Sequence, residues 1–154
     1  MKDRFEPVLK NKLGSFNGEI LGFTKCPDDT DMIVEAINSF VERGAELILL
    51  TGGMSVDPDD VTPSAIRKTG ARLVTQGVPM QPGNMLTMAY LENTMLIGVP
   101  GAGVHSPITS LDVFLPRVFA GIEIKKEDIA GMGEGGLCKQ CKVCHYPNCV
   151  FGRK

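Results

Sequence analysis

Apolar residues recur every three or four positions in four stretches of the chain, a spacing typical of helices that bury one face. Within residues 30–43, for example, Ile33, Ile37 and Phe40 form such a stripe, and Gly44 follows as a terminator. Each of these helices can bury its apolar face against a sheet. The predicted helices cover residues 4–13, 30–43, 62–69 and 104–120.

Shorter apolar or alternating runs lie between the helices and predict strands. The predicted strands cover residues 19–25, 46–51, 71–75, 85–91 and 94–99. The last two flank Glu92 and Asn93 and therefore predict a β-hairpin. Because strands alternate with helices, we expect an α/β fold of three layers, a mostly parallel sheet with helices on both faces.

The periodic pattern ends near Gly121, and the rest of the chain has a different composition. A charged stretch and the glycine-rich residues 131–136 come first, and four cysteines follow. We therefore expect two parts. Residues 1–121 would form the α/β domain, and residues 122–154 a glycine-rich linker with an irregular cysteine-rich tail.

Composition narrows the class of protein. A chain of 154 residues can bury a core as a single domain. Its formal net charge of −2 predicts no broad basic surface for nucleic acid. No apolar run approaches the roughly 20 residues of a membrane span, and the first twelve residues are charged throughout, unlike a signal peptide. We expect a cytoplasmic protein with no membrane or nucleic-acid partner.

A glycine turn after the apolar run at residues 47–50 is the first candidate site. Gly52 and Gly53 can bring backbone N–H groups close to a ligand at the end of a strand. A helix follows, with Thr62 as the predicted N-cap and Pro63 in its first position, so the helix dipole would favour an anion at the turn. The pattern indicates a phosphorylated small molecule as ligand.

This turn is one of three motifs that occur in a fixed order along the chain. They are the segment Cys26 to Asp29 before the second helix, the turn itself leading to Asp60, and two Pro-Gly loops, Pro82 with Gly83 and Pro100 with Gly101. In this order they resemble the molybdopterin-binding domain shared by molybdopterin adenylyltransferases and molybdopterin molybdotransferases. The resemblance extends over roughly residues 4–121.

The resemblance implies a pocket for the terminal phosphate and pterin of molybdopterin or of its adenylylated form. It implies that Asp28 and Asp60 are catalytic and hold a hydrated Mg²⁺ against phosphate oxygens, which suits the preference of magnesium for one or two carboxylates plus substrate oxygens. It also implies a homo-oligomer. The residues implied in binding are Thr51, Gly52, Gly53, Ser55, Pro82, Gly83, Pro100 and Gly101.

The sequence departs from the family pattern in three places. The usual opening strand and its Gly-Asp-Glu loop are missing, so we expect a domain that lacks its first strand. Gln81 and Asn84 stand where molybdotransferases usually carry lysines, which weakens binding of the molybdate dianion because neither side chain is charged. Ala102 and Gly103 replace the Asn-Pro that commonly follows the last Pro-Gly.

These observations leave alternatives open for the function. The leading hypothesis is Mg²⁺-dependent transfer in molybdenum cofactor biosynthesis, either adenylylation or molybdenum insertion. A second is a carrier or sensor module that binds molybdopterin without turnover and has a metal or redox tail. A third is a metal-binding scaffold unrelated to pterins.

The tail carries four of the five cysteines within twelve residues, Cys138, Cys141, Cys144 and Cys149. Such spacing in a chain without an export signal is more typical of a metal site than of disulfides. Four thiolates could hold Zn²⁺ or an iron–sulfur cluster. The alternatives are a flexible tail with reduced thiols and a sulfur or redox relay to the dithiolene.

Overall fold

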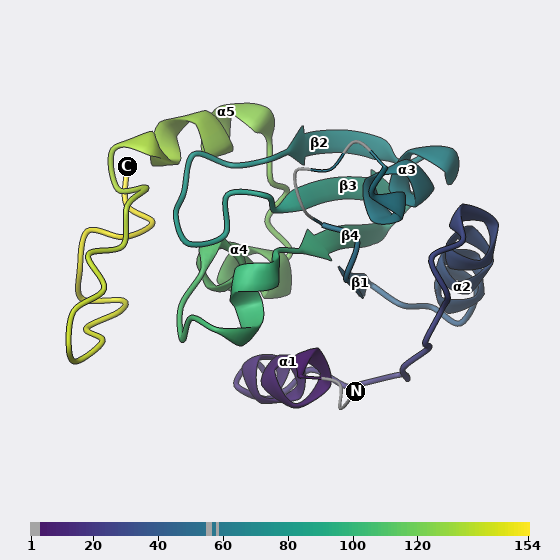
Figure 1. The fold of residues 1–154 in the computed structure, drawn as a ribbon, viewed down its shortest axis with the longest axis horizontal. Coiled ribbons are helices and arrows are strands. Elements are labelled where there is room, and N and C mark those ends of the chain that lie inside the picture. Colours follow the sequence, from purple (N-terminus) through teal and green to yellow (C-terminus); the bar gives the residue numbers. More distant parts are fainter. Residues whose placement is uncertain (1–3, 55–56, 58) are drawn as a thin grey trace.

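A computed structural model describes residues 4–54, 57 and 59–154 and has an α/β fold, as predicted (Figure 1). Four strands form one sheet in the order β1-β4-β3-β2. They are β1 (Leu47–Thr51), β2 (Arg72–Gln76), β3 (Thr87–Leu91) and β4 (Thr94–Val99). The α-helices are α1 (Phe5–Gly14), α2 (Thr30–Glu42), α3 (Val61–Lys68), α4 (Ser110–Phe119) and α5 (Lys126–Ala130), and the 3-10 helices are η1 (Gly101–Val104) and η2 (Gly131–Gly133).

The prediction of a mostly parallel sheet is wrong in the described part of the chain. β1 pairs with β4 in parallel, whereas β4 with β3 and β3 with β2 are antiparallel. The predicted hairpin at Glu92 and Asn93 accounts for one antiparallel pair, and Glu92 adopts the positive φ of 54° that the tight turn needs. The other arises because the loop 77–86 contains no helix, and parallel neighbours need a longer crossover.

Helices cover both faces of the sheet, which confirms the predicted three layers (Figure 1). Successive residues of β4 point to opposite faces, so Ile97 joins the core under α4 while Leu96 joins the core under α2 and α3. The first core contains Phe114 and the second contains Ile37, all of them almost completely buried. No helix in the described residues is long and apolar enough to cross a membrane.

The strand predicted at residues 19–25 is absent. The segment runs from α1 to α2 with no backbone hydrogen bonds to a strand among the described residues, and Leu21 and Phe23 stay exposed. Side-chain contacts hold it instead, because Arg43 donates a hydrogen bond to the Leu21 carbonyl at 2.6 Å and the Lys10 ammonium lies 4.8 Å from the Phe23 ring centroid. An apolar pattern cannot make a strand without a neighbouring strand to pair with.

Residues 122–136 are more ordered than a linker requires. Residues 125–128 of the charged stretch form the start of α5, and Ile124, Ile129 and Met132 are buried in the same core as α4. The Tyr90 hydroxyl accepts a hydrogen bond from the Ile124 N–H at 2.9 Å. The division into two parts at Gly121 stays a prediction.

Helix starts follow the capping rules only in part. Asp29 caps α2, since its side chain accepts a hydrogen bond from the Met32 N–H at 3.0 Å. Thr62 is not the N-cap of α3, because that helix begins at Val61 and Asp60 occupies the cap position. The Thr62 hydroxyl has another partner in the candidate site.

Candidate functional site

Three of the predicted loops meet at one edge of the sheet, the edge at which β1 and β4 end and β3 begins. β1 and β4 are parallel and in register at Thr51 and Val99, so the turn after β1 and the Pro100 loop after β4 leave the sheet side by side. β3 enters the sheet at the same edge, with Thr87 paired to Gly98, and the Pro82 loop leads into it. The fold therefore gathers segments that are distant in the sequence.

The glycine turn has the conformation that its residues predict. Gly52 and Gly53 have φ values of 83° and 55°, a region that favours glycine. The Thr62 hydroxyl on α3 donates a hydrogen bond to the Gly52 carbonyl at 2.7 Å, and a Cβ at Gly53 would lie only 3.0 Å from that hydroxyl oxygen. Thr62 thus fixes the turn against α3, whereas the predicted binding residue Ser55 lies outside the described residues.

Met54 anchors the turn to the sheet, a role that the sequence reasoning missed. The side chain is 7% exposed and packs over Gly98 of β4, where a Cβ would lie 2.6 Å from its sulfur. The signal in the sequence is a glycine inside the otherwise apolar run 94–99. The beginning of the turn is therefore held from both sides, by Met54 and by Thr62.

The Pro82 loop is locked against the first turn of α4. The Ser110 N–H donates to the Pro82 carbonyl at 3.1 Å, and the Ser110 hydroxyl donates to the Gly83 carbonyl at 2.6 Å. Gly83 has a φ of 103°, and a Cβ there would overlap the Ser110 hydroxyl. Both Pro82 and Gly83 are buried, so this loop supports the shape of the edge.

The second Pro-Gly loop is more accessible. Pro100 is buried and its carbonyl accepts a hydrogen bond from the Gly103 N–H at 2.9 Å, which starts η1. Gly101 is exposed and has open space where a Cβ would lie. A ligand at this edge could approach the backbone of Gly101 closely.

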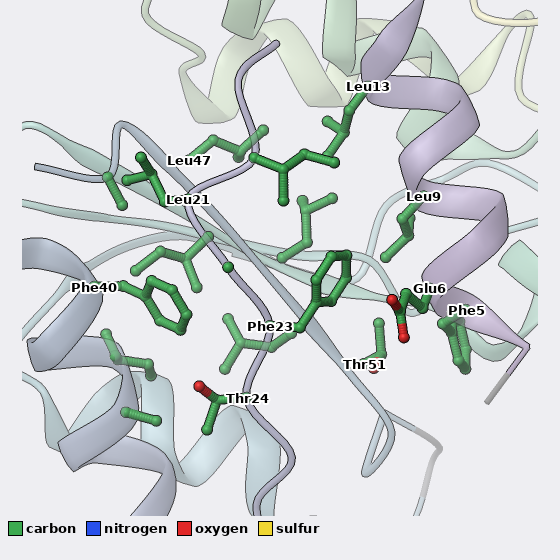
Figure 2. A pocket seen from close by; sticks show the side chains of 18 of the residues that line it. Phe5, Glu6, Leu9, Leu13, Leu21, Phe23, Thr24, Phe40, Leu47 and Thr51 are labelled. Carbon is green, nitrogen blue, oxygen red and sulfur yellow. The ribbon is translucent and has the colours of Figure 1, made fainter. Parts of the chain in front are cut away.

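A cavity of about 600 Å³ lies between α1, α2, β1 and residues 19–28, which connect the two helices. Figure 2 shows Leu9 and Leu13 of α1 pointing into this space from one side and Phe40 of α2 from the other. The lining also includes Asp28, Thr51, Gly52 and Thr62, which belong to the candidate edge. The cavity therefore joins an apolar space to the polar end of β1.

The two predicted catalytic carboxylates occupy different positions. Asp28 is exposed and lines the cavity, together with Thr51 and Gly52. Asp60 is half-buried at the start of α3, and it is not among the described residues that line the cavity. A magnesium ion shared by Asp28 and Asp60 therefore stays a prediction.

The tail cysteines are reduced and unequal in exposure. Cys138 and Cys149 are half-buried against the main core, whereas Cys141 and Cys144 are exposed. Within the described part of the chain, no three His, Cys, Asp or Glu side chains are gathered closely enough to hold a metal ion. The structure therefore does not assemble the predicted four-cysteine set.

Comparison with known families assigns the domain that contains the three loops. Residues 1–120 match the family described as "Probable molybdopterin binding domain". The chain belongs to this family. The molybdopterin-binding domain accounts for all three loops, and it ends before the cysteine tail.

Individual relatives agree with the family. The molybdopterin-binding domain is 24% identical to a molybdopterin molybdenumtransferase of Synechococcus elongatus over 78% of this chain and 30% of that protein. It is 32% identical to a molybdenum cofactor biosynthesis bifunctional protein of the same organism over 77% of this chain and 41% of that protein. The chain thus spans less than half the length of these two relatives.

A solved structure supports the fold. The molybdopterin biosynthesis enzyme MoaB from Thermus thermophilus superposes with a TM-score of 0.60 and 21% identity, covering 78% of this chain and 84% of that chain. The architecture of the molybdopterin-binding domain is therefore that of a known α/β fold.

Proposed function

We propose that this domain binds molybdopterin or its adenylylated form at the edge where the three loops meet. The observation that carries the proposal is the register of β1, β4 and β3, which gathers Gly52, Gly83 and Gly101 at one edge of the sheet. Membership of the molybdopterin-binding family supports the choice of ligand.

The glycine turn is the proposed grip for the terminal phosphate. The turn leads into the N-terminus of α3, where the helix dipole favours an anion. Thr62 and Met54 hold the beginning of the turn before ligand arrives, so little order is lost on binding. The exposed Gly101 at the same edge would form another wall of the site, and the cavity beside Thr51 would take an apolar part of the ligand.

The proposed chemistry is a transfer at the phosphate or the dithiolene, assisted by Mg²⁺. Asp28 and Asp60 would hold the ion, whose charge offsets the repulsion between a nucleophile and the phosphate oxygens. The protein would contribute mainly by positioning the reacting groups. Gln81 and Asn84 are both exposed but uncharged, which favours adenylylation or simple binding over molybdate insertion.

Titration of the purified chain with molybdopterin under anaerobic conditions tests binding. We expect saturable heat release in isothermal titration, weakened at least tenfold by Asp60→Ala in the presence of Mg²⁺. Asp59→Ala is the matched control, because Asp59 is an exposed carboxylate one residue away. Equal affinity of wild type and D60A would support a scaffold unrelated to this site, and absence of binding would refute the proposal.

A second assay separates an enzyme from a carrier. Saturated protein is incubated with ATP and Mg²⁺ to detect adenylylation, or with adenylylated molybdopterin and molybdate to detect AMP release. Turnover that is lost in D28A and D60A supports the transferase. Tight binding without either product would sink the transfer step and leave the carrier or sensor function.

A further inference from the structure

The cysteine tail lies outside the family domain, because the family match ends at residue 120. Residues 138–154 of the tail contain no helix or strand and form a closed loop. In Figure 1 the tail lies at the opposite end of the molecule from α2, beside the connection between β2 and β3. Its four thiols therefore need an explanation separate from the ligand edge.

Backbone hydrogen bonds fix both ends of this loop. The Gln81 N–H donates to the Gly136 carbonyl at 2.6 Å, and the Cys138 N–H donates to the Gln81 carbonyl at 2.8 Å. The Gly152 N–H donates to the Gly135 carbonyl at 2.9 Å, so the loop returns to its own starting point. All four tail cysteines lie between these anchors.

The base of the loop is packed too tightly for any residue but glycine. A Cβ would overlap the Val150 carbonyl oxygen at Gly135 and the Pro79 carbonyl oxygen at Gly136, and at Gly152 it would lie 2.6 Å from the Val113 side chain. The base is therefore a defined structure, although it contains no helix or strand.

Aromatic packing places two of the thiols beside the core. Phe151 is 3% exposed, and Tyr146 packs edge-on against it with ring centroids 6.4 Å apart. The Tyr146 hydroxyl donates to the Asp112 carbonyl at 3.3 Å. These contacts hold Cys149 half-buried beside the core, as the Gln81 bridge does for Cys138.

The charged residues of the tail all have one sign. Residues 137–154 contain no aspartate or glutamate, and their charged residues are all cations: Lys139, Lys142, Arg153 and Lys154. Four thiolates around a divalent ion leave a net negative charge, which the interleaved lysines offset.

We propose that Cys138, Cys141, Cys144 and Cys149 form a four-thiolate metal centre that closes this loop. The half-buried pair stays in place, and the exposed pair folds onto it as the metal displaces the thiol protons to solvent. A loop without helix or strand gains its order from the metal, so separated thiols before binding are expected. The ligand is a thiophilic centre, either Zn²⁺ or an iron–sulfur cluster.

The centre has a consequence for the neighbouring ligand edge. Cys138 is tied through its N–H to Gln81, which immediately precedes the Pro82–Gly83 turn. Ordering the loop around a metal therefore restrains Gln81 and the turn. This restraint on the turn is separate from pterin binding and can be measured without any pterin.

Metal analysis and a visible spectrum of the full chain, purified anaerobically, test the centre. About one zinc per chain in colourless protein identifies the zinc form, and brown protein with iron and sulfide identifies the cluster. The double variant C141S/C144S should lose the metal, whereas C26S, which changes the cysteine outside the tail, should keep it. Equal metal in wild type and C141S/C144S, or metal-free wild type after reconstitution with Zn²⁺ and with iron and sulfide, overturns the proposal.

Two measurements distinguish loss of the centre from misfolding. The changed thiols are exposed, so metal-free wild type and C141S/C144S should have the same far-UV circular dichroism and melting temperature. Hydrogen exchange should then slow at least threefold on metal binding in residues 79–86 and 136–152 of the wild type only. Unchanged exchange in residues 79–86 would refute the link to the turn, and unchanged exchange in both segments would refute the closed loop.

Discussion

Substituting Gly83 by alanine tests the locked Pro82 loop most directly. The native φ of 103° is unfavourable for alanine, and the added Cβ would overlap the Ser110 hydroxyl and lie 2.9 Å from the Ser110 nitrogen. A left-handed conformation costs about 1–2 kcal/mol for a residue with a Cβ. Overpacking a tight site costs about 1–3 kcal/mol more. We expect G83A to lower the free energy of unfolding by about 2–5 kcal/mol.

Gly70→Ala is the matched control, since Gly70 also has a positive φ, 82°, but has open space around its Cβ position. It should cost only the backbone part, about 1–2 kcal/mol. At about 3 °C per kcal/mol for a domain of this size, the melting temperature should fall by roughly 6–15 °C in G83A and 3–6 °C in G70A.

Thermal unfolding followed by circular dichroism measures both variants, together with S110A and the double variant G83A/S110A. Removing the hydroxyl relieves part of the overlap, so the double variant should be more stable than the sum of the two single losses predicts. Equal losses in G83A and G70A, or strictly additive losses in the double variant, would refute the close packing of this loop.

Four other changes test separate contacts. Asp29→Ala removes the cap of α2 and should destabilise the domain by about 1 kcal/mol in denaturant unfolding, whereas Asp31→Ala in the first turn should cost less; no difference would contradict the capping. The Thr87 hydroxyl is buried with no hydrogen-bond partner among the described residues. Thr87→Val should therefore be neutral or should stabilise the domain by up to about 1 kcal/mol in the same assay; destabilisation by more than about 1 kcal/mol would indicate that the hydroxyl has a partner. Thr62→Val removes the hydrogen bond to the Gly52 carbonyl. In calorimetry it should lose more free energy of molybdopterin binding than free energy of unfolding, and unchanged binding would show that the turn is held without this bond. A hydrogen bond from the Lys125 backbone, with Lys154 and Arg117 nearby, lowers the pKa of the Asp128 carboxyl below its usual 3.8. The ionised carboxylate therefore stabilises the fold above that pH, and this contribution is lost as the pH falls through the lowered pKa. The difference in melting temperature between wild type and Asp128→Asn should shrink below about pH 4, and a constant difference would exclude this linkage.

The sequence predicts the elements that carry their own signals. α2 has an N-cap at Asp29, an apolar stripe and a terminating glycine, and it forms within a residue of its expected bounds. The hairpin of β3 and β4 was equally local, because two apolar runs flank a two-residue turn. Capping and periodicity act over one or two turns of chain, so a single sequence reveals them.

Features that depend on distant partners could not be predicted in this way. Residues 19–25 have the pattern of a strand, yet pairing needs a neighbour that local pattern cannot supply. The short α5 was missed because its five residues include three charged ones. The packing of Met54 on Gly98 brings together positions 44 residues apart, and only the β1–β4 pairing places them in contact.

The candidate site shows the same division. The order of the glycine and Pro-Gly motifs predicted a common ligand site, and the strand register brings the loops of Gly52, Gly83 and Gly101 to one edge. The roles of individual residues in binding and catalysis stay predictions. The anchoring of the tail at Gln81 was invisible in the sequence, because a backbone hydrogen bond leaves no trace in side-chain composition.

The free edge of β1 has a consequence for handling the protein. Among the described strands β1 pairs only with β4, and its other edge borders the cavity with the run Leu47, Ile48, Leu49 and Leu50. A strand edge without a partner strand can act as a template for strand pairing between molecules. Storage life should therefore fall steeply with protein concentration.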